Sequence, residues 1–196
     1  MTQNEITSIV LVGVGGQGIL LASEITAQAA IACGYDVKTN EVHGMAQRGG
    51  SVLAQIRYGQ KVYSPLVAKR EAKVLYSLER IEALRFQDFL APGGLAVVNE
   101  QVLVPVTVSS GAALYPADAY ERLKQTFSKL IYLDAAGIAG ALGNIKAANV
   151  VLLGAMSLAL DLPLEGWYAA IEKTVKPAFV DLNKKAFDEG RTQEHV

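Results

Sequence analysis

The apolar residues near the start of the chain change from a strand-like to a helix-like pattern across a cluster of glycines. Residues 6–12 form a mainly apolar run that ends at a glycine, which is typical of a strand buried on both faces. Residues 19–33 follow with apolar positions at helical spacing, and Gly34 is placed to end that helix. A second strand is expected over residues 36–42. The pattern predicts a β-α-β opening with glycines at the strand-to-helix turn.

The next part of the chain indicates an antiparallel insertion. Apolar and polar residues alternate through residues 51–58, as they do in a half-buried strand. A Gly-Gln pair at residues 59–60 then predicts a turn, and we expect residues 62–67 to form the second arm of a hairpin. Pro65 places that arm at a sheet edge, because proline cannot donate to a ladder.

Strand and helix patterns alternate again up to residue 134 and then only helical patterns remain. The expected strands are 74–78, 95–99 and 130–134, with a broken β run at 102–108, and the expected helices are 79–90, 118–129, 135–142, 147–160, 164–175 and 178–189. We predict one α/β domain over residues 1–196, with about 190–196 as a flexible tail. It is Rossmann-like, with a largely parallel sheet, an antiparallel hairpin insertion and a helical C-terminal end.

Composition narrows the classes of function. The single cysteine excludes an internal disulfide, a Cys-ligated zinc site and an iron–sulfur cluster, so no metal ligands are assigned. A net charge of -1 without a basic block makes nucleic acid an unfavourable partner. The longest apolar stretch, residues 147–160, is shorter than the roughly 20 residues of a membrane span. Without a targeting signal, the chain is expected to be cytoplasmic and not bound to a membrane.

The chain is also unusually apolar for its size. Hydrophobic residues make up 51% and charged residues 19%, below the roughly 25% charged residues of an average domain. We expect part of this apolar surplus, especially residues 147–160, to support or form an interface with another subunit.

The glycine cluster is the first candidate binding site. Gly13, Gly15 and Gly18 match G-x-G-x-x-G between a predicted strand and a predicted helix, where backbone N–H groups and the helix dipole bind a phosphate. Together with Gly16 and Gln17 they are assigned to cofactor binding. The acid that a dinucleotide site needs about 20 residues later is only approximately placed. A turn that merely packs the helix on the sheet is the alternative.

A second polar loop leaves the carboxyl end of the second predicted strand. His43 opens this loop, and Gln47, Arg48, Gly49 and Gly50 lie within it. The last four are assigned to cofactor binding, with Arg48 as a partner for a phosphate or carboxylate, and His43 is assigned to a partner or structural role. A solvent-facing loop in which Arg48 pairs with a nearby acid is the alternative.

Two asparagines flank the start of the apolar helix expected at residues 147–160. Asn144 is placed as a helix N-cap, whereas Asn149 lies within the apolar run. A buried amide without a partner costs about 1–3 kcal/mol, so Asn149 needs a partner, either backbone of this domain or another chain. Both residues are assigned to a partner or structural role.

The residues needed for autonomous catalysis are few. There is no G-x-S-x-G, P-loop, H-E-x-x-H or Gly-Asp-Gly motif; His195 lies in the polar tail, and Cys33 fits a small core residue. No catalytic residue is therefore assigned, and the chain is expected to need partners for activity.

Taken together, three motifs resemble the gamma-type subunit of the 2-oxoacid:ferredoxin oxidoreductases. They are Val12-Gly13-Val14-Gly15-Gly16-Gln17-Gly18, the segment at residues 41–50 with the sequence Glu-Val-His-Gly-Met-Ala-Gln-Arg-Gly-Gly, and the Gly143-Asn144 to Asn149 segment. The second motif is most similar to the beta subunit of the indolepyruvate branch. The likeness runs from residue 6 to about residue 187.

This resemblance implies oxidative decarboxylation of a 2-oxoacid, on this likeness indolepyruvate or another aryl-pyruvate, with coenzyme A, giving acyl-CoA, carbon dioxide and reduced ferredoxin. Thiamine diphosphate, magnesium and the iron–sulfur clusters are then expected in larger partner subunits, with ferredoxin contacted indirectly. This chain would bind no cofactor tightly, contact coenzyme A, be inactive alone and be able to form a homodimer.

Two other functions fit the same motifs. A stand-alone Rossmann-type reductase would hold NAD(P) or a flavin on the glycine loop, and an assembly module would contact no ligand at all. The identity of the oxidised acid, the electron acceptor and the subunit stoichiometry do not follow from the sequence.

Overall fold

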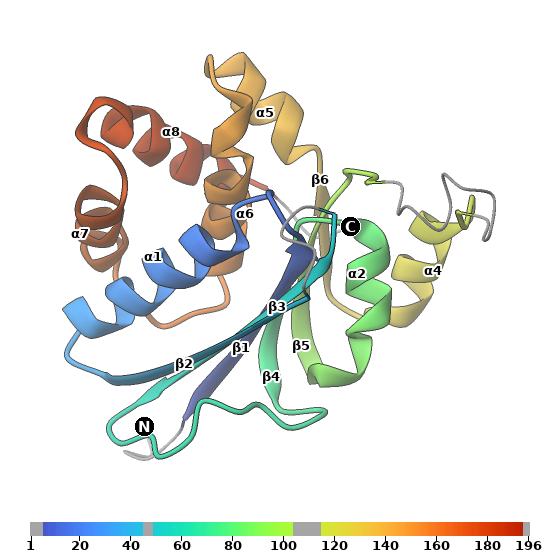
Figure 1. Ribbon diagram of the computed structural model, residues 1–196, viewed down its shortest axis with the longest axis horizontal. Coiled ribbons are helices and arrows are strands. Elements are labelled where there is room, and N and C mark those ends of the chain that lie inside the picture. Colours follow the sequence, from blue (N-terminus) through green and yellow to red (C-terminus); the bar gives the residue numbers. More distant parts are fainter. Residues whose placement is uncertain (1–5, 45–48, 104–114, 194–196) are drawn as a thin grey trace.

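The computed structural model describes residues 6–44, 49–103 and 115–193, and these residues build a six-stranded sheet between helices (Figure 1). The strands are β1 (Thr7–Val14), β2 (Asp36–His43), β3 (Ser51–Gly59), β4 (Ala72–Ser77), β5 (Leu90–Asn99) and β6 (Leu130–Leu133). The α-helices are α1 (Ile19–Ala32), α2 (Arg80–Arg85), α4 (Ala119–Thr126), α5 (Ala135–Ala141), α6 (Ala148–Ser157), α7 (Leu164–Thr174) and α8 (Val180–Arg191). Short 3-10 helices are η1 (Gln87–Phe89), η2 (Ile145–Ala147) and η3 (Pro177–Phe179).

The sheet is mixed, in the order β2-β3-β1-β4-β5-β6. β1, β4, β5 and β6 are parallel, whereas β3 is antiparallel to both of its neighbours, β1 and β2. The predicted α/β class, the antiparallel insertion and the helical C-terminal end are confirmed. The β-α-β opening is modified, because β3 lies between β1 and β2 and separates them.

The predicted second arm of the hairpin is wrong. β3 forms its hairpin with β2, and residues 62–67 contain no strand. Side chains of β3 satisfy the backbone of this segment instead: Gln55 accepts from Val67 N at 3.1 Å, and the Arg57 guanidinium donates to the Ser64 and Leu66 carbonyls at 3.3 and 3.2 Å. These contacts replace a ladder that Pro65 could not have completed.

Asp36, at the start of β2, holds the beginning of this segment. Its carboxylate accepts from Val62 N at 3.0 Å, pairs with Lys38 and lies 3.6 Å from Lys61 Nζ. The hydrogen bond from Lys38, followed by the one from the Val62 amide, lowers the pKa of Asp36 from its ordinary 3.8 to about 2.

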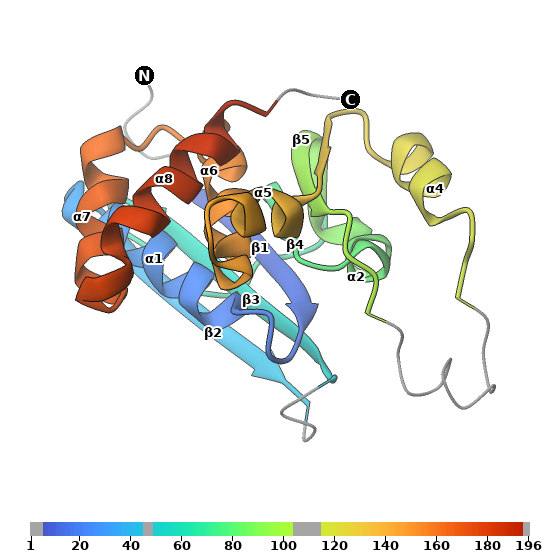
Figure 2. The same ribbon diagram turned by 90° about the horizontal axis from the view of Figure 1, so that it is seen from above.

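The two faces of the sheet support two hydrophobic clusters. Alternate residues of β1 separate between them: Ile9 and Leu11 join the cluster under α1, α6, α7 and α8, whereas Val10 and Val12 join the cluster that includes Leu123 of α4. Figure 2 shows α2 and α4 apart from the larger helical layer, with the sheet between them. Among the described residues, no helix is long and apolar enough to span a bilayer.

Helix α6 lies inside the larger cluster. Every residue from Asn149 to Ser157 is buried, and its Gly154 crosses α8 at Gly190. A Cβ at Gly154 would lie 1.9 Å from the Phe187 carbonyl oxygen. These side chains are therefore buried within their own chain, whereas Leu158 is 45% exposed, and a role of residues 147–160 in supporting or forming a subunit interface stays a prediction.

Candidate functional site

The glycine loop connects β1 to α1 and leaves the start of α1 without a cap. Gly16 and Gly18 have φ values of +101° and +90°, in the left-handed region that glycine adopts at little cost. Gly18 is the N-cap residue, makes no side-chain cap bond, and no acid lies in the first turn of α1. Among the described residues, no side chain caps the first N–H groups of this 14-residue helix, and the helix dipole favours an anion there.

Two glycines of the motif, Gly13 and Gly18, are also required by close neighbours. Gly13 lies within β1, and a Cβ there would approach Gln17 Oε1 and Ile19 Cδ1 to 2.9 Å each. A Cβ at Gly18 would lie 2.6 Å from Asn149 Nδ2 of α6. The third glycine of the motif thus allows α6, rather than a strand, to approach the loop.

Asn149 finds its partner within this chain. Its Nδ2 donates to the Gly18 carbonyl at 3.2 Å, and its own backbone carbonyl accepts from the Tyr76 hydroxyl at 2.9 Å. The side chain is 3% exposed, and its Oδ1 has no hydrogen-bond partner among the described residues. Asn149 therefore fixes the start of α1 against α6. Asn144 has the expected structural role, capping η2 by accepting from Lys146 N at 3.1 Å.

Gln17 turns its side chain into the protein. Its Oε1 accepts from Val14 N at 2.7 Å, and its Nε2 donates to the Leu78 carbonyl at 2.9 Å and to Gln101 Oε1 at 3.1 Å. These bonds join the glycine loop to the residues that follow β4 and β5. Gln17 thus fixes the loop from the protein side. A ligand on the solvent side of the loop would contact the loop backbone and not the Gln17 side chain.

The structure brings the two predicted loops together. Gly15 N donates to the Gly50 carbonyl at 2.8 Å, and Gly49 N donates to the Gly15 carbonyl at 3.4 Å. The pairing follows from the register of β1 and β3, in which Val14 faces Ser51. Gln47 and Arg48 lie outside the described residues. On the far side of the loop, the Ser51 hydroxyl hydrogen-bonds the buried Glu82 carboxylate of α2.

A cavity of about 400 Å³ lies where these loops meet. Its lining residues come from the glycine loop, the first turn of α1 and the ends of the β2–β3 hairpin: Val14, Gly15, Gly16, Gly18, Ile19, Leu20, His43 and Val52. His43 is the one titratable side chain among the described residues that line it, and none of these residues is acidic. Leu20 is 48% exposed and presents an apolar surface. The arrangement suits a ligand with an anionic group beside an apolar one.

A buried polar side chain that the sequence pattern does not single out donates to the same Leu78 carbonyl as Gln17. Asn99, fully buried at the end of β5, donates to the Leu78 carbonyl at 3.3 Å and accepts from Ala135 N at 3.1 Å, which ties β5 to the start of α5. The available signal was a polar residue directly after an apolar strand, the position at which open α/β sheets place functional groups.

Glu79, which follows β4, is a second missed residue. It is 2% exposed, caps α2 by accepting from Ile81 N at 2.6 Å and Glu82 N at 3.0 Å, and accepts from the Tyr115 hydroxyl at 2.8 Å. Burial, and after it the bond to Glu79, raises the pKa of Tyr115 to about 12. The Arg80 guanidinium also lies over the Tyr115 ring, 5.0 Å from its centroid. This cluster anchors the chain at residue 115.

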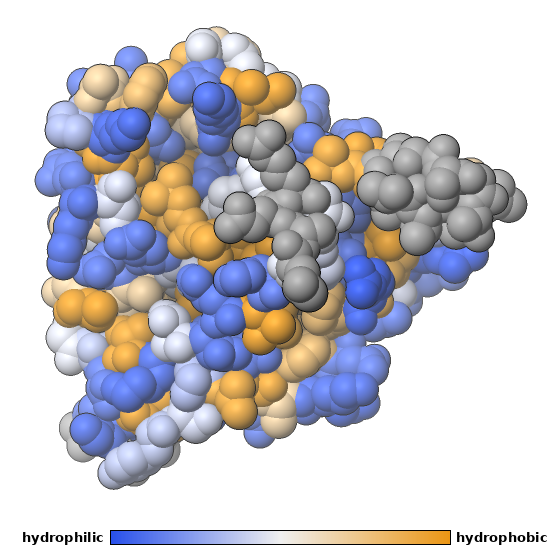
Figure 3. All heavy atoms as spheres, in the orientation of Figure 1, coloured by the Kyte–Doolittle hydropathy of each residue, from blue (hydrophilic) through white to orange (hydrophobic). Residues whose placement is uncertain are grey.

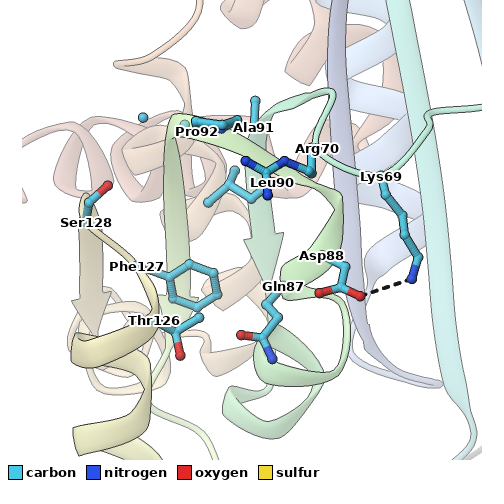
Figure 4. A pocket seen from close by; sticks show the side chains of 12 residues that line it. Lys69, Arg70, Gln87, Asp88, Leu90, Ala91, Pro92, Thr126, Phe127 and Ser128 are labelled. Atoms are coloured by element: carbon cyan, nitrogen blue, oxygen red, sulfur yellow. Dashed lines mark hydrogen bonds and ion pairs between the residues drawn. The ribbon is translucent and has the colours of Figure 1, made fainter.

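Another cavity, of about 470 Å³, lies at the opposite end of the parallel strands, near their amino ends (Figure 4). Its residues precede the parallel strands: Arg70 before β4, Ser128 before β6, and Leu90 at the start of β5. Lys69 pairs with Asp88 across its rim at 3.0 Å. Open α/β sheets bind ligands at the carboxyl ends of their strands, so the glycine-loop cavity is the better candidate.

The described residues offer little redox or metal chemistry. They contain no group of three or more His, Cys, Asp and Glu residues that could hold a metal ion. Cys33 is half-buried, and burial raises the pKa of its thiol, which disfavours the reactive thiolate.

Comparison with known proteins agrees with this architecture. Residues 8–193 match the family described as pyruvate ferredoxin/flavodoxin oxidoreductase. The chain is 43% identical over 188 residues to the indolepyruvate oxidoreductase subunit IorB of Pyrococcus horikoshii, with 93% of each chain covered. It resembles the crystal structure of a keto/oxoacid ferredoxin oxidoreductase gamma subunit from Geobacter sulfurreducens with a TM-score of 0.68 and 26% identity, covering 94% of this chain and 95% of that one.

A larger protein contains the same fold as one part. The 2-oxoglutarate:ferredoxin oxidoreductase from Magnetococcus marinus aligns with a TM-score of 0.71 and 17% identity over 96% of this chain but only 31% of that one. The chain belongs to the pyruvate ferredoxin/flavodoxin oxidoreductase family, as its gamma-type domain.

Proposed function

We propose that this chain is the gamma-type subunit of an indolepyruvate or aryl-pyruvate:ferredoxin oxidoreductase and is inactive alone. In this reaction the bond between the carboxylate and the keto carbon of the 2-oxoacid breaks and carbon dioxide leaves. The acyl group joins the sulfur of coenzyme A, the thiol proton is released, and the electron pair passes to ferredoxin. Identity of 43% to an indolepyruvate oxidoreductase subunit supports the choice of substrate.

The division of labour between subunits is part of this proposal. Thiamine diphosphate, magnesium and the iron–sulfur clusters are placed in the larger partner subunits, because the chain has one cysteine and its described residues contain no metal-ligand cluster. Ferredoxin then meets those subunits rather than this one. A cytoplasmic location belongs to the same proposal.

The observation that carries the proposed role is the junction of the two glycine loops at the uncapped start of α1. The N–H groups there suit a phosphate of coenzyme A, and Leu20 and Val52 suit an apolar part of the same molecule. The Magnetococcus marinus protein was solved with coenzyme A bound. Gln47 and Arg48, outside the described residues, remain candidates for a second anionic group.

The stand-alone reductase has less support. A Rossmann dinucleotide site needs the strand that carries the ribose-binding acid beside β1, but here β3 lies between β1 and β2. Asp36 lies at the start of β2 and is engaged with Lys38 and the Val62 amide. The chain therefore has the glycine motif of a dinucleotide site but no ribose-binding acid on a strand next to β1.

The proposal is tested by reconstituting the chain with the larger subunit and measuring indolepyruvate- and coenzyme A-dependent reduction of a viologen dye. Leu20→Glu places a negative charge at the start of α1, and we expect it to raise the KM for coenzyme A about tenfold while leaving the KM for the oxoacid unchanged. Ile31→Glu is the matched control, because Ile31 lies at the other end of α1 and both side chains are 48% exposed.

An inactive reconstituted complex, or turnover by the isolated chain, would contradict the proposed subunit role. Equal KM values for coenzyme A in the two variants would contradict the assignment of the glycine-loop cavity, and the assembly module would then be favoured.

A further inference from the structure

A groove separate from the glycine-loop cavity borders the same turn of α1. It has a volume of about 470 Å³ and lies between α1, η2, the end of α7 and η3. Its apolar walls are formed by Leu21, Ala147, Val175 and Phe179. In Figure 3 hydrophobic residues gather on this face between α1 and α8. Because Leu20 lines the glycine-loop cavity and Leu21 lines this groove, the first turn of α1 separates the two.

Large apolar side chains lie exposed at this groove. Phe179, in its wall, is 43% exposed. Ile145, in η2, is not part of the lining, but it lies between the lining residues Asn144 and Lys146 and is 62% exposed. By contrast, Ala147 in the same short helix is 3% exposed and belongs to the core. Exposed apolar residues that adjoin a concave surface are typical of a protein-binding site.

The rim of the groove is positively charged. Lys146 and Lys176 both line it, and neither lies within ion-pair distance of a carboxylate among the described residues. None of the described residues that line the groove is acidic. Asn144, Thr174 and Asn183 supply the remaining polar surface, but the Thr174 hydroxyl and the Asn183 amide already donate to the Ala170 and Phe179 carbonyls, at 2.7 and 2.8 Å. The groove therefore combines an apolar floor with two cations that have no partner in the described chain.

We infer that this lysine-rimmed groove binds a segment of the larger oxidoreductase subunit that carries a large apolar side chain flanked by Asp or Glu. The inference rests on the proposed function, since it needs a partner subunit. The apolar side chain covers Phe179 and Ile145, and the acidic residues pair with Lys146 and Lys176, which sets the orientation of the segment. A segment bound here lies across the first turn of α1 from the coenzyme A site proposed above.

The test is the affinity of the purified chain for the larger subunit, measured by biolayer interferometry and checked by native mass spectrometry. Ile145→Glu places a carboxylate in the apolar contact, and we expect the Kd to rise about tenfold or more. Leu66→Glu is the control, because Leu66 is 59% exposed and lies in the segment between β3 and β4, away from the groove. Circular dichroism verifies that both variants are folded.

A second pair of variants tests the charge complementarity. Lys176→Glu is expected to weaken the complex about tenfold at low ionic strength, with a smaller difference at high salt. Lys129→Glu, at an exposed lysine that precedes β6, is expected to leave the Kd unchanged.

The outcomes separate the inference from the proposed function. A wild-type chain that does not bind the larger subunit overturns the proposed function, and the inference with it. If the wild type binds and Ile145→Glu binds as well as Leu66→Glu, the function stands and the groove is not the interface. A homodimer that Ile145→Glu dissociates, with the larger subunit still bound, also overturns the inference, because the occupant is then a second copy.

Discussion

Replacing Gly18 with alanine separates two reasons for a glycine at the start of α1. Its φ of +90° disfavours any side chain, and its missing Cβ leaves room for the Asn149 amide, whose Nδ2 would lie 2.6 Å away. Gly16 isolates the first reason, because its φ is +101° and a Cβ there would meet nothing within 4 Å. The pair therefore allows backbone strain and side-chain crowding to be measured separately.

The expected magnitudes follow from these contacts. Gly16→Ala should cost about 1–2 kcal/mol, the ordinary cost of a left-handed residue with a side chain. Gly18→Ala should cost about 3 kcal/mol, because it also displaces the Asn149 amide and breaks its 3.2 Å bond to the Gly18 carbonyl. In an Asn149→Ala background, Gly18→Ala should cost only about 1–2 kcal/mol, which gives a coupling energy of about 1–2 kcal/mol.

Urea unfolding followed by tryptophan fluorescence measures all of these values. Trp167 is the only tryptophan and is fully buried, so it reports the loss of the core around α7 and α8. If Gly18→Ala costs as much in the Asn149→Ala background as in the wild type, the crowding argument is refuted. If Gly16→Ala costs as much as Gly18→Ala, the positive φ alone explains both.

Three other predictions concern the fold and the loop support. Gly190→Ala should destabilise the chain by several kcal/mol in urea titrations, since its Cβ would lie 1.8 Å from a carbonyl of α6; Gly140→Ala, with nothing within 4 Å, should be neutral or stabilising by about 0.5–1 kcal/mol. Because the pKa of Asp36 is lowered from 3.8 to about 2, its stabilising effect should be complete above pH 3.8 and disappear as the pH falls through 2. Asp36→Asn should remove this pH dependence from thermal unfolding. An unchanged acid profile in this variant would show that Asp36 does not stabilise the fold through its ionised carboxylate. Gln17→Ala should increase hydrogen exchange at the Val14 amide and raise the KM for coenzyme A, with kcat at saturation unchanged; wild-type exchange would show that Gln17 does not hold the loop.

Local patterns were sufficient for most of the elements. β1, α1 and β2 follow from runs of five or more residues with one periodicity, and the glycine loop lies between them as predicted. Two extents differ most: β5 begins at Leu90 rather than Leu95, and the helix expected over residues 79–90 is divided between α2 and η1. The start of β5 depends on the pairing of Leu90 with Ala72 and on the irregular register between Ala72 and Val74, which no local pattern contains.

Local sequence patterns do not specify which distant segments pair with one another. The alternation in residues 51–58 predicts a strand but not its neighbours, so the partner of β3 was assigned to the nearest apolar segment instead of β2. The apolar run of α6 has the same composition whether it faces its own core or another subunit, and only the packing against α8 decides. The bonds of Gln17 and Asn99 to the Leu78 carbonyl span 61 and 21 residues, which explains why this support of the glycine loop was missed.

The position of β3 has a consequence for how this site changes in evolution. The loop after β2 is the tip of a hairpin whose strands are fixed over eight paired positions, and its last glycines bond to Gly15. Residues can be inserted or exchanged at the tip with little effect on the strands, because doubling the length of a flexible loop costs only about 0.6 kcal/mol. Exchanges at the hairpin tip therefore need not disturb the glycine loop, and swapping this tip between homologues would test whether it contributes to the specificity of the proposed site.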